Sequence, residues 1–402
     1  MKIVGCIAEF NPFHHGHELY LKKAKEISKA DAVVVVMSGD FVQRGEPAII
    51  NAERRTQVAL SYGADLVLEL HPAYVLASAE YFALGAIWSL EATGLITDLI
   101  FGSESGNIDD FYRVQDYLRN HGERFSTQIP LAMQGGLSYS SAIAKVLEQE
   151  ISISGKGFFS KPNNILGIEY VKAMLNRNQN FQIHTYQRQG ANYHDQTIQG
   201  VMESASAIRR HLHAGGQPGV LVPEKSLHSL SHFYKENRMY QDLEAYFPFL
   251  QYRICLLSPS ALAQYAGCDE GMENLLWKKI HRVATYSELV QSMTSKRYPA
   301  SRIKRFLLSI LLGYTKTLAS SFKTEGPSYL KPLGFTDTGQ SLMKKIKLKG
   351  KVPLLSNVAE SWNSDTPPRG LGLDLAAKDI YHLGAKTSFS LGTGLRTAPK
   401  KG

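Results

Sequence analysis

The sequence predicts an α/β fold, in which a parallel sheet built by the first half of the chain is followed by a mostly helical part. Three observations support this prediction. Short apolar, β-branched runs alternate with helical patterns up to about residue 213. Loops of unusual composition follow the apolar runs, where ligands bind in parallel sheets. Beyond the segment 215–223, which is rich in Gly and Pro, the strand pattern largely fades.

Five apolar runs predict the strands of this sheet, and helical patterns fill the intervals between them. Strands are expected at 3–8, 32–37, 65–70, 98–101 and 181–186, and helices between the first two strands and at 51–62, 78–93, 138–149, 163–176 and 204–213. Such alternation implies right-handed crossovers between parallel strands, with ligands at the carboxyl ends of the strands. The loops at these ends are 10–17, 38–45, 102–106 and 187–194.

The loop after the first strand carries the most informative motif, Phe10-Asn11-Pro12-Phe13-His14-His15-Gly16-His17. The start of a helix has unpaired N–H groups and a partial positive charge, so it favours anions such as phosphate. His14 and His17 lie on one face of the first turn, and Gly16 lets a ring or phosphate approach the backbone. For a single histidine, a surface or capping role is the more common explanation. An HxGH tetrad between a strand and a helix instead favours phosphate binding.

The length of 402 residues predicts two domains, which we place at 1–222 and 223–402. The net charge of +9 is unevenly distributed between them. Residues 296–351 contain thirteen Lys and Arg against Glu325 and Asp337, so the rest of the chain is slightly acidic. A basic block confined to one region indicates a polyanionic partner.

The sequence predicts neither a signal peptide nor a membrane span. Met1-Lys2 leads directly into a strand, and no apolar run approaches ~18 residues. Cys6, Cys255 and Cys268 lack the spacing of metal ligands. These features predict a cytoplasmic protein without disulfides or structural zinc.

The HxGH tetrad and a second motif, Ser204-Ala205-Ser206-Ala207-Ile208-Arg209, resemble those of the nucleotidyltransferase superfamily. Members of this superfamily are Rossmann-like enzymes that attack the α-phosphate of ATP. The second motif usually reads I-S-S-T-x-I-R. In this chain Glu203 replaces the Ile, Ala205 replaces one Ser and Ser206 stands in place of Thr, so that Ser204, Ile208 and Arg209 match.

Over nearly the whole chain, the pattern more closely resembles one family, the bacterial tRNA(Met) cytidine acetate ligases. The segments that carry this resemblance are 8–17, 37–48, 101–104 and 161–170. The family commonly has Asn where this chain has Asp40. The resemblance implies a Rossmann-like nucleotidyltransferase domain with a parallel sheet, followed by a mostly helical C-terminal domain.

The resemblance also implies a two-step reaction that does not need acetyl-CoA. Acetate attacks the α-phosphate of ATP to give acetyl-adenylate and pyrophosphate. The exocyclic amine of the wobble cytidine in elongator tRNA(Met) then takes the acetyl group and releases AMP, forming N4-acetylcytidine. Mg²⁺ is expected as the counter-ion of ATP, although no carboxylate cluster identifies a metal site held by the protein. No protein partner is implied.

Adenylation moves negative charge onto the α-phosphate and the leaving pyrophosphate, so catalysis depends on positioning and electrostatic stabilisation. His14 and His17 are therefore the candidate catalytic residues, as donors to phosphate and not as nucleophiles. Ser206 and Arg209 are candidates for the β- and γ-phosphates, with a solvated helix face as the alternative. Asn163 is equally compatible with a helix N-cap. The expected nucleotide-binding residues are Ile7, Phe10, Asn11, Pro12, His14, Gly16, His17, Tyr20, Gly102, Asn163, Arg188, Ser206 and Arg209.

The basic block is a candidate tRNA-binding surface, because Lys and Arg contacts to phosphates supply affinity for RNA. An ordinary solvated basic face is the alternative, and several aromatic residues of the block, such as Phe306, are expected to fill the helical core. For Arg54 and Arg55, a surface helix is at least as good an explanation as a function. The candidate tRNA contacts are Arg44, Lys296, Arg297, Arg302, Lys304, Arg305, Lys344 and Lys345. The choice of base requires a pocket for an unstacked cytidine, to which the sequence assigns no residues.

Two other functions are compatible with parts of the sequence. A nucleotidyltransferase that adenylylates a phosphorylated small molecule would explain the N-terminal motifs, but not the basic helical part. A non-catalytic RNA-binding protein would explain the basic block, but not the presence of both histidines and Arg209. Dependence of ATP–pyrophosphate exchange on acetate distinguishes the ligase from the small-molecule adenylyltransferase.

Overall fold

A seven-stranded sheet with the strand order β7-β6-β1-β2-β5-β8-β9 lies at the centre of the molecule. The computed structural model describes residues 1–134, 137, 139–153, 157–177, 181–188, 203–269, 271–385 and 390–402. Of the predicted strand-end loop 187–194, residues 187 and 188 are described, whereas 189–194 lie outside the described residues.

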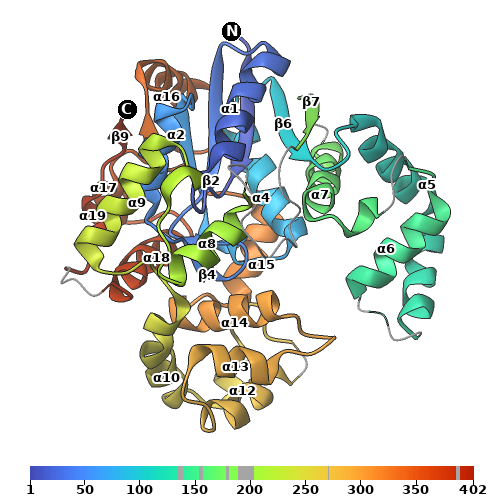
Figure 1. Ribbon diagram of the computed structural model, residues 1–402, viewed down its shortest axis with the longest axis vertical. Helices are drawn as coiled ribbons and strands as arrows, with labels where there is room; N and C mark the ends of the chain where they lie inside the picture. Colours follow the sequence, from blue (N-terminus) through green and yellow to red (C-terminus); the bar gives the residue numbers. More distant parts are fainter. Residues whose placement is uncertain are drawn as a thin grey trace.

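The five predicted strands are all present, and they run parallel to one another in the sheet (Figure 1). This confirms the predicted α/β fold. They are β1 (Ile3–Ala8), β2 (Ala32–Ser38), β5 (Leu66–Leu70), β6 (Asp98–Ser103) and β7 (Gln182–Gln187). Every residue of β2 is buried, because helices cover both faces of the sheet. A strand that is buried on both faces is a continuous apolar run, and this made it recognisable in the sequence.

Helices of the first half cover the sheet in two layers. The apolar residues of α1 (His15–Ser28) and α2 (Ala52–Ser61) pack on one face of the central strands. Those of α4 (Ala79–Ala92) and α7 (Pro162–Asn176) pack on the other face. Helix α1 lies between the first two strands, as predicted, and α2, α4, α7 and α8 (Ala205–His213) agree with their predicted bounds to within one residue.

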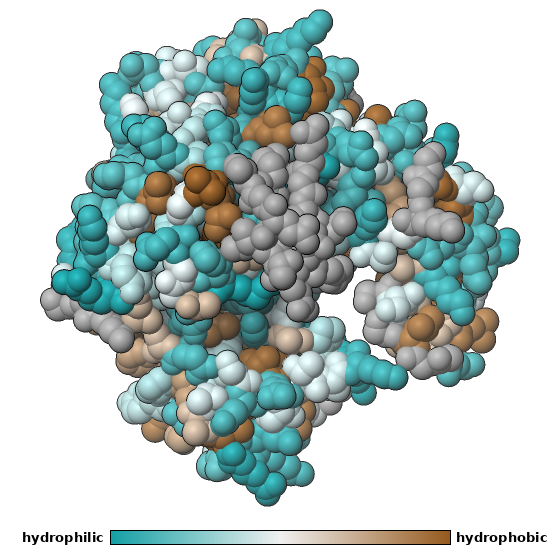
Figure 2. Space-filling model, in the orientation of Figure 1, coloured by the Kyte–Doolittle hydropathy of each residue, from teal (hydrophilic) through white to brown (hydrophobic). Residues whose placement is uncertain are grey.

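One long helical segment, α5 (Ile108–Gln134), which is kinked at His121, is an addition to the predicted elements. It packs against the predicted helix α6 (Tyr139–Glu150), and the pair projects to one side of the sheet (Figure 1). Figure 2 shows a gap in the surface between this pair and the lower helical lobe.

The second half of the chain is mostly helical, as expected. A lobe below the sheet contains α10 (Phe247–Cys255), α12 (Met272–Ile280), α13 (Tyr286–Met293) and α14 (Ala300–Leu312) (Figure 1). The remaining helices of this half are α9 (Glu224–Asn237), α11 (Pro259–Leu262), α15 (Lys316–Glu325), α16 (Asp337–Lys349), α17 (Val358–Trp362), α18 (Leu371–Leu383) and α19 (Thr393–Arg396). No helix in the described ranges is long and apolar enough to cross a membrane.

Two strands of the second half join the sheet, which the sequence did not predict. β8 (Pro332–Phe335) runs antiparallel to β5, and β9 (Lys400–Lys401) pairs in parallel with β8. Both are short, and β8 contains a Pro and a Gly, so neither has the apolar run of an interior strand. The division at 222/223 stays a prediction, but the chain after residue 223 contributes to the same sheet as the chain before it.

Candidate nucleotide-binding site

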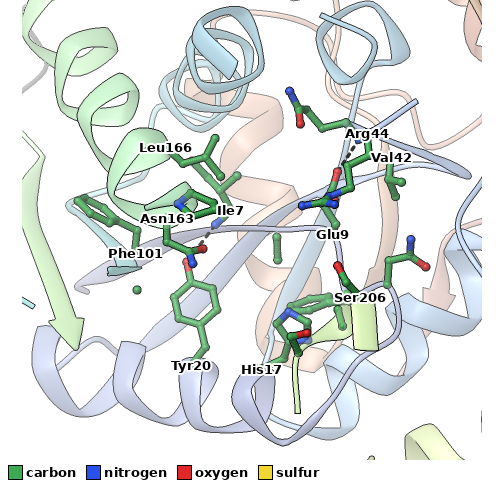
Figure 3. A pocket seen from close by; sticks show the side chains of 18 of the residues that line it. Ile7, Glu9, His17, Tyr20, Val42, Arg44, Phe101, Asn163, Leu166 and Ser206 are labelled. Atoms are coloured by element: carbon green, nitrogen blue, oxygen red, sulfur yellow. Dashed lines mark hydrogen bonds between the residues drawn. The ribbon is translucent and has the colours of Figure 1, made fainter. Parts of the chain in front are cut away.

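A cavity of about 430 Å³ lies at the carboxyl ends of the parallel strands, as the sequence predicted for a ligand site (Figure 3). It receives residues from the ends of β1, β6 and β7 and from the first turns of α1, α7 and α8. Twelve of the predicted residues line it: Ile7, Phe10, Asn11, His14, His17, Tyr20, Arg44, Gly102, Asn163, Arg188, Ser206 and Arg209. Pro12 and Gly16 do not belong to the lining.

The first turn of α1 is capped by its own histidines. His14 is the N-cap residue, and its Nδ1 accepts a hydrogen bond from the backbone N–H of Gly16 at 3.0 Å. The Nδ1 of His17 accepts a bond from the backbone N–H of His14 at 3.2 Å. Because each Nδ1 is an acceptor, each neutral ring carries its proton on Nε2. Capping therefore sets the tautomer that leaves Nε2–H as a donor.

Both histidines are neutral near pH 7. Burial and the neighbouring charges of Arg188 and Arg209 lower the pKa of His14 to about 3. Burial, His14 and Arg188 hold the pKa of His17 well below its usual value. The two rings are stacked, with centroids 3.8 Å apart, so one imidazolium would also repel another. The pair is suited to donate hydrogen bonds to phosphate without becoming charged.

The backbone before this helix is tightly constrained. Phe10 has a φ of 48°, in the left-handed region that bulky residues rarely adopt, and its fully buried ring packs edge-on to His17. A Cβ on Gly16 would lie 2.8 Å from the His14 ring. Gly16 is therefore needed to accommodate the capping ring, which differs from the predicted close approach of a ligand to its backbone.

Helix α8 brings a second helix N-terminus to the cavity. Its N-cap is Ser204, whose side chain accepts a bond from the N–H of Ala207 at 3.2 Å. Arg209 donates to the carbonyl oxygen of Asn11 at 2.7 Å and lies 3.7 Å from Glu46. Burial lowers the pKa of Arg209, but guanidinium groups remain charged in proteins. This cation is fixed beside the N-termini of both helices, where anions are favoured.

The opposite wall holds Gly102, Asn163 and Arg188. A Cβ on Gly102 would lie 3.0 Å from the Arg188 side chain. The side-chain amide of Asn163 donates to the Glu104 carboxylate at 2.7 Å, and the N-cap of α7 is Lys161, so the N-cap explanation for Asn163 is wrong. Apolar side chains missed in the sequence also line the cavity and make it suitable for a flat base: Val42, Phe82, Phe101, Leu166 and Tyr170.

The hydroxyl group of Tyr20 is already used within the protein. It donates to the carbonyl oxygen of Ile100 at 2.8 Å and accepts from the N–H of Ile7 at 3.2 Å (Figure 3). Tyr20 therefore ties the ends of β1 and β6 together beneath the cavity, and its ring is the part that a ligand would meet.

Arg55 organises the loops around the site and does not lie on the exposed face of its helix. Its side chain is fully buried, and it donates to the carbonyl oxygens of Glu9 at 2.5 Å and Ser38 at 3.1 Å, and to that of Gly39. Glu9 in turn accepts from the N–H of Gln43 at 2.7 Å. These contacts join the ends of β1 and β2, and local sequence offers no sign of them. Arg54, in contrast, is partly exposed and pairs with Glu236 on α9.

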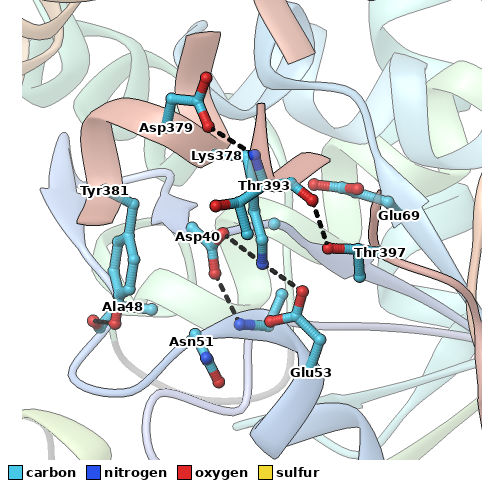
Figure 4. Close-up of polar contacts among 12 residues, drawn as sticks. Asp40, Ala48, Asn51, Glu53, Glu69, Lys378, Asp379, Tyr381, Thr393 and Thr397 are labelled. Atoms are coloured by element: carbon cyan, nitrogen blue, oxygen red, sulfur yellow. Dashed lines mark hydrogen bonds and ion pairs between the residues drawn. The ribbon is translucent and has the colours of Figure 1, made fainter. Parts of the chain in front are cut away.

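The acid at position 40 also has a structural partner far away in the sequence. Lys378 on α18 lies 3.0 Å from Asp40 and also pairs with Glu53 (Figure 4). Burial raises the pKa of Asp40, but the charges of Lys378 and Arg55 outweigh this and hold it below its usual value. The C-terminal helix is thereby fixed to the loop that follows β2.

The structure separates the predicted tRNA contacts. Lys304 lies 2.6 Å from Glu46, Arg305 donates to the carbonyl oxygen of Gln43 at 3.2 Å, and Arg302 pairs with Asp269. A Cβ on Gly45, whose φ is +76°, would lie 2.6 Å from the backbone nitrogen of Arg305. Lys304 and Arg305 thus hold α14 against the loop between β3 (Phe41–Val42) and β4 (Glu46–Pro47).

The aromatic residues of the basic block are mostly core residues. Phe306, Tyr314, Phe322 and Tyr329 are all buried, as expected for Phe306. Lys344 and Lys345 lie on α16, where Lys345 contacts Met1 at the amino end of the sheet. The basic block therefore forms no single surface, because its members occupy opposite ends of the strands.

A protein-held metal centre is not evident in the described ranges. They contain no group of three or more His, Cys, Asp or Glu side chains that could hold a metal ion. Among the described residues that line the cavity, Glu9 is the single carboxylate. Its Oε1 is occupied by Ser38 and Gln43, at 3.1 and 2.7 Å.

Comparisons with known proteins agree with this geometry. The model of the HIGH Nucleotidyl Transferase family matches residues 1–392. A tRNA(Met) cytidine acetate ligase of Acetivibrio thermocellus is 36% identical over 392 residues, covering 95% of this chain and 94% of that protein. One of Clostridium novyi is 35% identical over 405 residues, covering 99% of both.

Solved structures agree over the full length. The apo crystal structure of Thermotoga maritima TmcAL superposes with a TM-score of 0.91 at 30% identity, covering 100% of this chain and 99% of that one. A second structure of that protein, bound with alpha-thio ATP, gives 0.89 at 29% identity and the same coverage. The chain therefore belongs to the HIGH nucleotidyl transferase family and, within it, to the tRNA(Met) cytidine acetate ligases.

Proposed function

We propose that this protein is an ATP-dependent ligase that acetylates the wobble cytidine of elongator tRNA(Met), through acetyl-adenylate. The observation that carries the nucleotide half of this proposal is the convergence of two helix N-termini, two neutral histidines and Arg209 on one cavity. The acetate and tRNA half rests on the family, whose relatives are tRNA(Met) cytidine acetate ligases along the full chain.

In the first step, a carboxylate oxygen of acetate forms a bond to the α-phosphorus of ATP, and the bond to the pyrophosphate oxygen breaks. Negative charge grows on the α-phosphate and on the leaving pyrophosphate. The Nε2–H groups of His14 and His17 are placed to stabilise this charge as neutral donors, and Ser206 and Arg209 to bind the β- and γ-phosphates. The protein thus contributes position and fixed dipoles, and no covalent intermediate on a side chain is needed.

In the second step, the exocyclic amine of cytidine attacks the acetyl carbonyl carbon, AMP leaves and the amine loses one proton. The base has to be unstacked from the anticodon loop to reach the cavity. We place this reaction in the cytoplasm, in keeping with the free thiols of Cys6, Cys255 and Cys268.

Mg²⁺ would reach the site as the counter-ion of ATP. The cavity wall has cationic and neutral nitrogen donors and one engaged carboxylate, a set that does not fit a magnesium site built by the protein, because Mg²⁺ prefers several oxygen ligands. We therefore assign no step to a metal bound by this chain.

ATP–pyrophosphate exchange and nucleoside mass spectrometry test the proposal together. We expect exchange only when acetate is present, and N4-acetylcytidine in elongator tRNA(Met) after incubation with ATP and acetate. Exchange that is indifferent to acetate would favour adenylylation of another small molecule. Acetate-dependent exchange without modified tRNA would support the formation of acetyl-adenylate but contradict tRNA(Met) as the acceptor of the acetyl group.

A further inference from the structure

A second cavity, of about 670 Å³, lies next to the nucleotide cavity and shares part of its wall. Arg44, Ser206 and Arg209 line both cavities, so the phosphate-binding end of the first is adjacent to the second. The second cavity lies between the two halves of the chain. Its wall is formed by β4 and α8 on one side, and by η3 (Leu243–Tyr246), α13 and the start of α14 on the other.

The wall of this second cavity is polar and carries an excess of positive charge. In the part of the wall that the structure describes, four Arg and Lys side chains face two carboxylates, those of Glu46 and Asp242. Glu46 is already neutralised by Lys304, which lies 2.6 Å away. Burial alone would raise the pKa of Glu46, but the charge of this ammonium group outweighs burial and lowers it. A cavity with this balance favours an anionic ligand.

The same wall offers groups that suit a nucleobase. Tyr286, Val290 and Leu243 supply apolar surface for a flat ring. Two wall residues, Gln241 and Tyr286, each carry a buried polar side-chain atom with no hydrogen-bond partner in the part of the chain that the structure describes. Unpaired buried polar groups are uncommon in proteins, and a polar base edge would satisfy them.

We infer that the second cavity receives the acceptor nucleotide of the RNA substrate, an unstacked pyrimidine. Its amine enters the nucleotide cavity at the shared wall of Arg44, Ser206 and Arg209, after pyrophosphate has left that wall. This inference rests on the proposed function, because it requires an acyl-adenylate in the first cavity. Transfer needs the amine and the acetyl carbonyl in contact, so the acceptor site has to adjoin the nucleotide site. The second cavity meets this requirement by sharing three residues with the first.

The flank of the cavity is suited to the RNA backbone. Thr294 and Ala300 line the cavity, and the loop between them carries Lys296 and Arg297, both exposed. These two cations stand at the rim, where contacts to phosphate position a strand without reading its sequence. A third member of the basic block, Lys304, lines the cavity itself.

Filling the cavity tests the inference. Ala300 is exposed at the start of α14 and lines the second cavity but not the first, so Ala300→Trp adds bulk without disturbing the core. Ser301→Trp, one position further, lines neither cavity and is the matched control. Gln291→Trp, also exposed and lining only the second cavity, repeats the test from α13.

Two half-reactions are measured on each full-length variant: acetate-dependent ATP–pyrophosphate exchange, and acetyl transfer to a tRNA(Met) transcript. For Ala300→Trp and Gln291→Trp we expect transfer to fall by at least about tenfold, because the acceptor is displaced. In these variants the exchange rate should stay within about twofold of the wild-type rate. In Ser301→Trp both rates should stay within about twofold of wild type, as expected for an ordinary surface substitution.

Wild-type transfer rates in both filled variants would overturn the inference. So would a parallel loss of exchange and transfer in variants with wild-type circular dichroism and melting, because the second cavity would then belong to the ATP site. Failure of the wild-type protein to acetylate tRNA at all would instead reject the proposed function, so the two failures are distinguishable.

Discussion

The two ends of the parallel sheet differ in what their charged residues do. At the carboxyl end, Arg209 and Arg188 line a cavity together with two neutral histidines. At the amino end, charged residues form ion pairs with one another, such as that of the partly exposed Lys2 with the buried Asp98 at 3.0 Å. The β1 strand that separates these ends has six residues and spans about 20 Å.

This difference follows from the direction of the helices. In a parallel α/β fold, each helix that follows a strand begins at the carboxyl end, so its unpaired N–H groups and positive dipole end point there. The amino end receives helix C-termini, which do not favour anions. Basic residues are therefore not equivalent across the molecule, and a basic segment of sequence is informative only once its end of the sheet is known.

The largest effect is expected from His17→Ala. Loss of one preorganised donor to the α-phosphate should lower acetate-dependent pyrophosphate exchange by roughly 100-fold or more. Binding of tRNA, measured by filter binding, should change little. His15→Ala is the matched control, because His15 bonds to Glu18 and to the carbonyl oxygen of Val220 and does not line the cavity. Undiminished exchange in His17→Ala would remove its catalytic assignment.

The free energy of unfolding should depend more on a buried ion pair at the carboxyl end than on an exposed ion pair at the amino end. Lys378→Met leaves Asp40 and Glu53 without their buried cation, and we expect the free energy of unfolding to fall by about 3 kcal/mol. Lys401→Met breaks an exposed pair with Asp337, 2.8 Å apart at the amino end, and should cost less than about 1 kcal/mol. Urea denaturation of both variants measures the contrast, and equal losses would contradict it.

The pH dependence should come from the histidines of the carboxyl end. The pKa of His14 is about 3 in the folded protein against 6.5 when unfolded, so below pH 6.5 the unfolded state binds more protons. Stability should therefore decline by about 1 kcal/mol per such histidine between pH 6.5 and 5.5. Urea denaturation at these two pH values measures the decline in the free energy of unfolding. In His14→Asn this decline should be smaller by the contribution of one histidine. A decline of the same size in His14→Asn and in the wild-type protein would show that this ring is not held neutral.

The smallest effect is expected at the amino end. Charge reversal of Lys344 and Lys345 should weaken tRNA binding only about twofold. These lysines lie far from the nucleotide cavity, and salt screens their interaction with RNA phosphates. Reversal of Lys296 and Arg297, at the rim of the second cavity, should weaken it more and lower its salt dependence. Filter binding over a salt series compares the two pairs. A larger loss from Lys344 and Lys345 would reverse the comparison and place the tRNA elsewhere.

Much of the site was predictable because its signals are local. The strands are continuous apolar runs, and the HxGH tetrad sits where such a run meets a helix, so the phosphate-binding end follows from adjacent residues. The histidine tautomers were not predictable, since they depend on hydrogen bonds to Gly16 and His14 backbone groups. Arg55 was also missed, because nothing in its helix shows that its guanidinium group reaches four separate carbonyl oxygens.

The sequence by itself determined the alternation of strands and helices, the parallel direction of those strands, the position of the phosphate-binding motif and the family. Periodicity and motif spacing carry this information, because they are set by residues a few positions apart. Only the tertiary structure decided that β8 and β9 return to the sheet, that Lys378 holds Asp40, and that the basic block divides between two ends of the molecule. These features join residues far apart in sequence, whose contacts depend on how the whole chain packs and not on any local pattern.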